Sequence, residues 1–134
     1  MNYAEISKDT VSYLYKSYAS LKNSSLEPTV RILLELRTSQ INGCAYCCGL
    51  HLEEARKFNI PQEKLDLLAA WHTSTIFTDK EVAALQWCEE VTRLNKNKTR
   101  ELLKAYYSER EIVDLTACVA IMNALNRMAI NLRD

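Results

Sequence analysis

Residues 28–58, PTVRILLELRTSQINGCAYCCGLHLEEARKF, decide the fold of this chain. Pro28 stands where a helix can begin, and Asn42-Gly43 would end that helix. The sequence therefore predicts one helix over residues 28–41 and a second over about residues 44–58. The first of these helices carries apolar side chains at helical spacing on one side: Val30, Leu33, Leu34 and Ile41.

Five further helices are predicted outside this stretch, and capping boxes start two of them. Thr78 with Glu81, and Ser108 with Glu111, each place a hydroxyl three residues before a glutamate, which is the pattern of a helix start. No segment of strand length alternates between polar and apolar residues. The further helices cover residues 7–21, 62–71, 79–94, a short stretch that begins at Thr99, and a final stretch from Ser108 to about Leu132.

Glycine and proline are scarce, with two of each in the 134 residues. Many short strands would need many tight turns, so this scarcity favours long helices. We find no low-complexity tract, internal repeat or linker, and 134 residues is a one-domain length. The sequence therefore predicts an all-α helical bundle with a single domain over residues 1–134.

The charges of the chain cancel, because 17 basic residues balance 17 acidic ones. Without a basic field, neither nucleic acid nor an anionic membrane surface is an expected partner. The first residues lack the charged start and apolar run of a signal peptide. The longest apolar stretch, residues 115–122, is interrupted by Thr116 and followed by Asn123, so we expect it to be too short and too polar to span a bilayer. We therefore expect a cytoplasmic protein.

The final helix is apolar on nearly every face from Leu115 to Leu125. A helix with one side in water would carry polar residues along that side. We therefore expect this helix to lie at the centre of the fold or at a contact between subunits.

Five cysteines stand out in a chain that we expect in a reducing compartment, where structural disulfides are rare. Catalytic or metal-binding thiols are therefore the better interpretation. On a helical wheel of residues 44–58, several thiols and a histidine share one arc, so we expect them to face the interior together. This inward arc holds Cys44, Cys47, Cys48, His51, Ala55 and Phe58, and the opposite side holds Tyr46, Gly49, Glu53, Arg56 and Lys57.

Cys44 and Cys47 fall in the first turn of the second helix, where free backbone N–H groups and the helix dipole favour an anion. A thiolate there has a lowered pKa, and the thiolate is the reactive form. The spacing also lets the two sulfurs close a disulfide. His51 follows Cys47 by four residues, so it can reach that sulfur or a water beside it and supply the base that a nucleophile needs. The pattern predicts a thiol redox centre formed by Cys44, Cys47 and His51.

Two other interpretations fit the same residues. One is that the cysteines are small hydrophobic residues that pack in the core beside a packed histidine. The other is a zinc site of Cys44, Cys47 and His51 with Cys48 or His72 as the fourth ligand, which is disfavoured because the ligands crowd one short stretch and no second C-x-x-C is present. We expect no metal and no cofactor. The remaining cysteines and the second histidine are expected to be structural: Cys48, Cys88 and Cys118 in the core and His72 at the surface.

Two interpretations are open for whether Glu35 is the carboxylate partner of His51. If the chain reverses at Gly43, Glu35 and His51 lie eight residues before and after the turn, at similar heights on neighbouring helices. The helical wheel instead places Glu35 on the polar side of the first helix, which favours an exposed Glu35 paired with Arg31, four residues earlier. Arg37 falls on the apolar stripe, so it must reach the surface or pair with a carboxylate elsewhere.

Residues 39–47, SQINGCAYC, followed by His51, resemble the signature of the AhpD-like alkylhydroperoxidases within the carboxymuconolactone decarboxylase family. Residues 81–92 and 126–130 resemble the downstream and final helices of that family, so the resemblance runs from about residue 10 to the C-terminus. It implies an AhpD-like helical bundle that assembles into trimers or hexamers. It also implies antioxidant reduction of small hydroperoxides through the cysteine pair, with an external dithiol or a partner peroxiredoxin as reductant.

The resemblance also implies a role for each site residue. Cys47 would be the peroxidatic cysteine and would pass through a sulfenic acid. Cys44 would resolve it to a disulfide and donate a proton, and His51 would belong to the proton relay. The family pattern has a glutamate twelve residues before the first cysteine, where this chain has Ile32. Glu35 follows nearly one turn later. It could replace that glutamate only if the helix is rotated or if its side chain is able to reach the site.

The leading hypothesis is therefore a thiol-dependent peroxidase, in which Cys47 attacks a peroxide, Cys44 condenses with the sulfenate and an external dithiol restores both thiols. The first alternative is a thiol–disulfide oxidoreductase or redox sensor without peroxidase activity, which the isoleucine at position 32 favours. The second is a binding scaffold with inert cysteines. Decarboxylases of the same superfamily typically lack the paired cysteines, so the resemblance does not favour decarboxylation.

Overall fold

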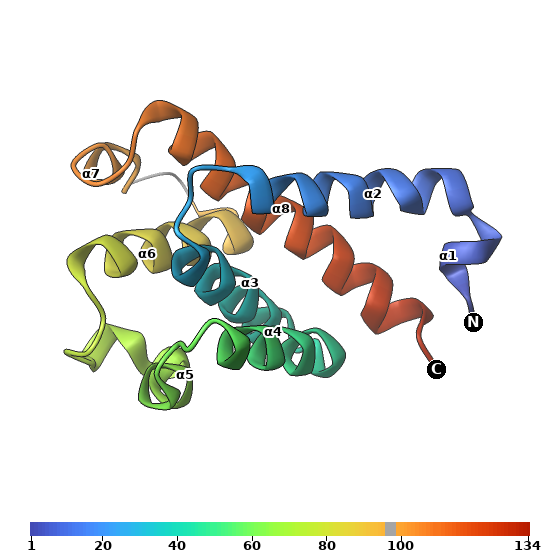
Figure 1. The fold of residues 1–134 in the computed structure, drawn as a ribbon, viewed down its shortest axis with the longest axis horizontal. Helices are drawn as coiled ribbons and strands as arrows, with labels where there is room; N and C mark the ends of the chain where they lie inside the picture. The colour runs from blue at the N-terminus through green and yellow to red at the C-terminus, as the bar shows by residue number, and fades with distance from the viewer. Residues whose placement is uncertain (96–98) are drawn as a thin grey trace.

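The computed structural model describes residues 1–95 and 99–134, and neither range contains a β-strand. Helices form most of both ranges, which confirms the all-α prediction (Figure 1). The helices are α1 Tyr3–Ile6, α2 Lys8–Ser20, α3 Pro28–Asn42, α4 Ala45–Lys57, α5 Gln62–Leu67, α6 Asp79–Arg93, α7 Arg100–Leu103 and α8 Glu109–Leu132, with the 3₁₀ helices η1 Leu21–Asn23 and η2 Leu68–Thr73.

Local capping starts α6 and α8 at the predicted positions. The side-chain hydroxyls of Thr78 and Ser108 accept hydrogen bonds from the backbone N–H groups of Glu81 and Glu111, both at 3.2 Å. Each glutamate accepts in return from the backbone N–H of its cap residue, at 2.9 Å. Both predicted capping boxes are therefore confirmed.

Three departures from the predicted helices lie in the first half of the chain. A short additional helix, α1, precedes the predicted helix over residues 7–21, which becomes α2 followed by the 3₁₀ turn η1. The predicted helix over residues 62–71 divides into α5 and η2, where Ala70 has φ and ψ of −114° and 26°, outside the helical range. These changes shorten two predicted helices and leave the order of the others unchanged.

Helix α3 is the centre of the bundle. It packs against α4, α6 and α8, and every side chain from Val30 to Ser39 is buried. One cluster of apolar side chains joins α3 to α6 and α8, and a second joins α3 to α4 and α5. Because neighbours cover α3 on every face, its polar side also lies in the interior. There Arg37 pairs with Glu89 of α6, with Nη2 and Oε1 2.8 Å apart, so of the two alternatives for Arg37 the structure shows pairing with a carboxylate.

Helix α8 lies against α2, α3 and α6, which is the first of the two placements expected for it, the centre of the fold. By length and composition it is also long and apolar enough to cross a membrane, which corrects the expectation that the apolar stretch here is too short and too polar. In this structure its buried side chains, which include Leu115, Val119 and Met122, pack inside the bundle as those of a core helix do.

The two chain termini meet at one end of the bundle, beside α1 and the last turn of α8 (Figure 1). The Met1 ammonium lies 2.5 Å from Asp134 Oδ2 and 3.1 Å from the carbonyl oxygen of Leu132. The Arg133 guanidinium stacks on the Tyr46 ring of α4, 3.5 Å from its centroid. This end of the molecule therefore adjoins the start of α4, where the predicted site residues lie.

Candidate active site

The reversal between α3 and α4 positions the cysteine pair. Gly43 ends α3 with a φ of 71°, in the left-handed region that a residue without a Cβ adopts without strain. The Gly43 N–H donates to the Gln40 carbonyl at 3.1 Å, and the Cys44 N–H donates to the Ser39 carbonyl at 2.9 Å. The chain then turns back, so that α4 packs against α3 and Cys44 becomes the N-cap of α4.

Cys44 and Cys47 form a disulfide at the start of α4, with their Cα atoms 5.3 Å apart. The Cys44 Sγ also accepts a hydrogen bond from the Cys47 backbone N–H at 3.3 Å, so the helix start supplies a donor to this sulfur. Both cysteines are buried, as is His51, which confirms the inward arc for these three residues. The arc was wrong for Phe58, whose side chain is 48% exposed, because this residue is the C-cap of α4 and the chain leaves the helix there.

A pocket of about 470 Å³ opens beside the disulfide. Cys47 and His51 line this pocket, whereas Cys44 does not. Its volume is in the range of small-molecule binding sites. Of the two sulfurs, that of Cys47 therefore meets a molecule that enters. The other lining residues are mainly aromatic or aliphatic, with four charged residues: Tyr3, Tyr15, Tyr18, Tyr46, Leu50, Phe58, Met122, Leu125 and Ala129, with Lys22, Glu53, Glu54 and Lys57.

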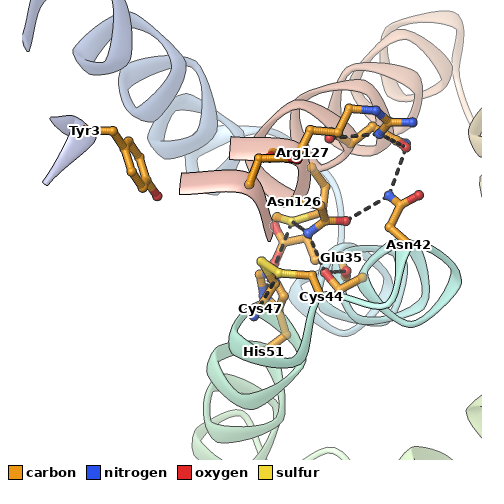
Figure 2. Close-up of a disulfide and its surroundings, with 12 residues drawn as sticks. Tyr3, Glu35, Asn42, Cys44, Cys47, His51, Asn126 and Arg127 are labelled. Atoms are coloured by element: carbon orange, nitrogen blue, oxygen red, sulfur yellow. Dashed lines mark hydrogen bonds and ion pairs between the residues drawn. A yellow bond between two sulfur atoms is a disulfide. The ribbon is translucent and has the colours of Figure 1, made fainter. Parts of the chain in front are cut away.

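Glu35 lies in the interior beside His51, as the first of the two interpretations held, and not at the surface, as the favoured one held. Its side chain is fully buried, and its Oε2 is 3.3 Å from His51 Nδ1 across the contact between α3 and α4 (Figure 2). The predicted pairing with Arg31 is confirmed, because Arg31 Nη1 donates to both carboxylate oxygens at 2.9 and 3.0 Å. The exposure was predicted wrongly because the polar side of α3 faces α4 and not water. His51 Nδ1 is near enough to form an ion pair but makes no well-aligned hydrogen bond.

Glu54 of α4 is a site residue that the helical wheel did not single out. Arg31 Nη2 donates to Glu54 Oε1 at 2.9 Å, and Glu54 Oε2 lies 3.9 Å from His51 Nδ1. The neighbouring His51 ring, together with the Arg31 guanidinium, lowers the pKa of Glu54 to about 2. Its position three residues after His51 is the signal that could have identified it, because side chains at this spacing are neighbours on a helix.

The two ring nitrogens of His51 face groups on different helices. Burial alone would lower the pKa of His51, but the Glu35 and Glu54 carboxylates outweigh this effect and raise the pKa above its ordinary value. On the other side of the ring, Nε2 lies 3.3 Å from Met122 Sδ of α8. The imidazole therefore joins the carboxylates of α3 and α4 to a sulfur of α8.

Asn126 of α8 ties this helix to the end of α3. It is fully buried, and its Nδ2 donates to Ser39 Oγ at 3.0 Å and to Met122 Sδ at 3.4 Å (Figure 2). Its Oδ1 accepts from Asn42 Nδ2 at 3.0 Å. These contacts fix the reversal that carries the cysteine pair, and no local sequence pattern predicted them.

The other cysteines lie outside the pocket lining. Cys88 and Cys118 are buried, as predicted, and Cys48 is only partly buried. Burial raises the pKa of the Cys88 thiol to about 11 and that of Cys118 well above its ordinary value. Neither thiol is therefore ionised near neutral pH.

The zinc site considered from the sequence is not assembled. Two of its sulfurs form the disulfide, and His72, which is exposed as predicted, has its Nε2 3.2 Å from Glu89 Oε2. Within residues 1–95 and 99–134, possible metal donors of Glu35, His51 and Glu54 lie within 4.8 Å of one another. A guanidinium already binds both of those carboxylates.

Comparison with known proteins identifies related chains. A model of the carboxymuconolactone decarboxylase family matches residues 6–90. The uncharacterized protein YdfG of Bacillus subtilis (strain 168) is 30% identical over 134 residues, which cover 97% of this chain and 91% of that protein. The uncharacterized protein YnjA of Escherichia coli (strain K12) is 26% identical over 113 residues, which cover 82% of this chain and 62% of that protein.

Two solved structures share the fold. A protein of unknown function from Agrobacterium tumefaciens, described as a candidate antioxidant defence protein AhpD, superposes with a TM-score of 0.94 at 31% identity and covers 100% of this chain and 94% of its own. An uncharacterized peroxidase-related protein from Silicibacter sp. TM1040 superposes with a TM-score of 0.74 at 21% identity, over 86% of this chain and 65% of its own. The second likeness shows the fold alone.

Proposed function

Because the chain belongs to the AhpD-like carboxymuconolactone decarboxylase family, we propose that it is a thiol-dependent peroxidase that reduces organic hydroperoxides. One observation carries this proposal: Cys47 lines a pocket of ligand size beside His51 and is bonded to Cys44 outside that pocket. One sulfur can therefore meet the peroxide while the other is in reach to resolve it. The apolar and aromatic lining supports an organic hydroperoxide in preference to hydrogen peroxide.

In the proposed reaction the Cys47 thiolate attacks the terminal oxygen of the hydroperoxide. A sulfur–oxygen bond forms and the O–O bond breaks, so that Cys47 becomes a sulfenic acid and the departing alkoxide takes up a proton to give the alcohol. The Cys44 thiol then gives up its proton and its sulfur attacks the sulfenic sulfur; the S–O bond breaks, the disulfide forms, and the departing hydroxide takes up a proton to leave as water. Two thiols and one hydroperoxide thus give one disulfide, one alcohol and one water.

Proton transfer at Cys47 is assigned to His51, with Glu35 as its carboxylate partner. Ile32, which occupies the position of the family glutamate, is fully buried among apolar side chains and carries no proton. Glu35 lies one turn later on the same helix, 3.3 Å from the imidazole, and supplies the missing carboxylate. An external dithiol or a partner peroxiredoxin then reduces the disulfide by exchange. The expected trimer or hexamer and the cytoplasmic location stay predictions.

The test is stopped-flow reaction of the reduced protein with cumene hydroperoxide and with hydrogen peroxide, with thiols counted before and after. We expect a fast loss of two thiols, faster with the organic peroxide. Cys47→Ser should abolish the reaction, because the attacking sulfur is gone. Cys44→Ser should still consume one equivalent of peroxide and stop at the sulfenic acid. Full turnover by Cys47→Ser would refute the proposal.

A second candidate is a thiol–disulfide oxidoreductase or redox sensor without peroxidase activity, favoured by Ile32 in place of the family glutamate. It requires the same cysteine pair but no peroxide chemistry. A protein of this class would form its disulfide readily in a dithiol–disulfide buffer and would consume hydroperoxide no faster than a free thiol. The stopped-flow experiment therefore separates the two candidates directly.

A further inference from the structure

Both ring nitrogens of His51 face atoms that can only accept a hydrogen bond. Nε2 lies 3.3 Å from the thioether sulfur of Met122, and Nδ1 lies 3.3 Å from Glu35 Oε2 and 3.9 Å from Glu54 Oε2. A thioether carries no proton, and an ionised carboxylate accepts only. A neutral imidazole would point a ring lone pair at one of these acceptors. An imidazolium, with a proton on each nitrogen, avoids this conflict and places its positive charge 3.3 Å from Glu35 Oε2, even though Nδ1 is not aligned for a hydrogen bond there.

Arg31 keeps the two carboxylates in their ionised form. Its Nη1 donates to both oxygens of Glu35 and its Nη2 donates to Glu54. A guanidinium has donors only, so a proton on either carboxylate would weaken this contact. Glu35 is on α3 and Glu54 on α4, and the one guanidinium holds both of them beside the imidazole.

The charges of this cluster balance when His51 is protonated. Among its buried and half-buried groups, one arginine and two glutamates leave one negative charge, in a region where Arg31 is 3% exposed and Glu35 is fully buried. The Lys22 ammonium, which also acts on Glu54, is exposed to water and is not part of this buried balance. Unpaired charge is costly in such surroundings. A second proton on the His51 ring removes the imbalance. The two carboxylates act in the same direction on the pKa of His51, which they raise despite its burial.

We propose that Glu54, fixed by Arg31, is a positioning residue that keeps His51 as an imidazolium cation. This inference rests on the proposed function and changes the role of His51 in it from a base to a cation. His51 then does not remove a proton from Cys47; its positive charge stabilises the Cys47 thiolate. When the O–O bond breaks, the Nε2 proton passes to the alkoxide, and the neutral imidazole later regains a proton from water.

The groups that face His51 come from several elements of the bundle, and a pH profile must be interpreted with all of them. Burial and the nearby carboxylates raise the pKa of Tyr18 above the working range. The His51 ring, the Arg31 guanidinium and, more weakly, Lys22 lower the pKa of Glu54. Titratable and charged groups around the imidazole include Glu35 and Arg31 of α3, Cys47 and Glu54 of α4, Tyr18 of α2, Lys22 of η1 and Cys118 of α8.

The test is NMR titration of the imidazole ¹³C–¹H signals of the oxidised full-length protein, in which the disulfide removes the Cys47 charge. The chain has two histidines, so His72 serves as an internal reference. We expect the pKa of His51 to lie above the ordinary value of about 6.5 and to fall by about 1 in Glu54→Gln. Glu63→Gln, which removes an exposed carboxylate of α5 outside the pocket lining, should leave the pKa of His51 unchanged. Glu54→Asp, which keeps a carboxylate, should retain most of the elevation of the pKa of His51. This variant provides the test if Glu54→Gln does not fold.

The rate of peroxide reaction supplies a second readout. If His51 acts as the cation, the rate of the reduced protein falls as pH rises through the pKa of His51, and this limb moves to lower pH by about the same amount in Glu54→Gln. A pKa of His51 that is unchanged in Glu54→Gln, or that lies below 6.5 in the unaltered protein, would overturn the inference. If no peroxide reacts at all, the proposed function fails while the titration still decides the state of His51.

Discussion

Helices α3 and α6 each carry a buried glutamate, Glu35 and Glu89, with an arginine and a histidine beside it. The two sites differ in the number of donors that reach each carboxylate. Within the described part of the chain, the hydrogen bonds to Glu35 come from Arg31, while His51 Nδ1 lies nearby without an aligned bond. At Glu89 the hydrogen bonds come from three residues, and His72 lies nearby as an ion-pair neighbour.

The Glu89 site is fully satisfied. Its Oε1 accepts from Arg37 Nε and Nη2 at 3.0 and 2.8 Å and from Trp71 Nε1 at 2.9 Å. Its Oε2 accepts from Arg93 at 2.8 Å and lies 3.2 Å from His72. The His72 ring stacks on Trp71, with centroids 3.7 Å apart. This carboxylate ties α3, α6 and η2 together, and hydrogen-bond donors reach both of its oxygens.

The comparison shows what separates a structural ion cluster from a candidate reactive one. His51 lies at a pocket that Cys47 also lines, and its ring nitrogens face acceptors only. His72 is at the surface, beside a carboxylate whose needs are already met. Burial and charge are similar for Glu35 and Glu89. The site of Glu35 differs because the neighbouring His51 Nδ1 makes no aligned hydrogen bond and because Cys47 lines the same pocket as His51.

The largest expected effect is a difference in peroxide rate between variants of the two histidines. His51→Gln should slow the peroxide reaction of the reduced protein by about 10²- to 10⁴-fold, the usual contribution of a positioned proton donor. His72→Gln should leave the rate within about twofold, because His72 lies outside the pocket lining. Stopped-flow rates at fixed pH compare the two variants, and similar losses in both would show that neither histidine is specific to the reaction.

The second expected effect is on stability, and here the variant at the Glu89 site is expected to lose more than the variant at the Glu35 site. Glu89→Gln should lower the free energy of unfolding by about 3 kcal/mol, because Arg37 is left buried without its anion. Its peroxide rate should change little. Glu35→Gln should lose peroxide rate first, since its acceptor for His51 is weakened. Urea unfolding of the oxidised proteins measures the stabilities, and a larger rate loss in Glu89→Gln than in Glu35→Gln would reverse our assignment of the two sites.

The smallest expected effect concerns the buried thiols. Cys88→Ala should cost about 1 kcal/mol of stability, for the atoms removed from the core. It should leave the peroxide rate and the count of two oxidised thiols unchanged, because burial raises the pKa of the Cys88 thiol to about 11. Thiol counts and rates on this variant check the point. A lost thiol equivalent would mean that Cys88 takes part.

Local chemistry accounts for the part of the fold that the sequence predicted. The Thr78 and Ser108 caps, the turn at Gly43 and the inward face of Cys44 and Cys47 each depend on residues within four positions of one another. Phe58 marks the limit of that approach. It shares the inward arc by periodicity but lies where α4 ends, so its side chain faces solvent.

The parts that could not be predicted depend on contacts between distant segments. Glu35 is buried because α4 covers the polar side of α3, and Arg37 finds its partner 52 residues away. Asn126 reaches Ser39 across 87 residues. A helical wheel shows which side of α3 is polar but not which neighbour covers that side. For Glu54, the spacing of three residues from His51 is a local signal, but its hydrogen bond from Arg31 of another helix is not.

The most direct test of the central claim identifies the sulfur that is oxidised first. Reduced Cys44→Ser/Cys48→Ser protein, which lacks the resolving thiol and its neighbour, is treated with one equivalent of cumene hydroperoxide and then with dimedone, which traps sulfenic acids. Peptide mass spectrometry locates the adduct. We predict the adduct on Cys47. Adducts on Cys88 or Cys118, or consumption of the peroxide with Cys47 unlabelled, would contradict the assignment of Cys47 as the sulfur that attacks the peroxide.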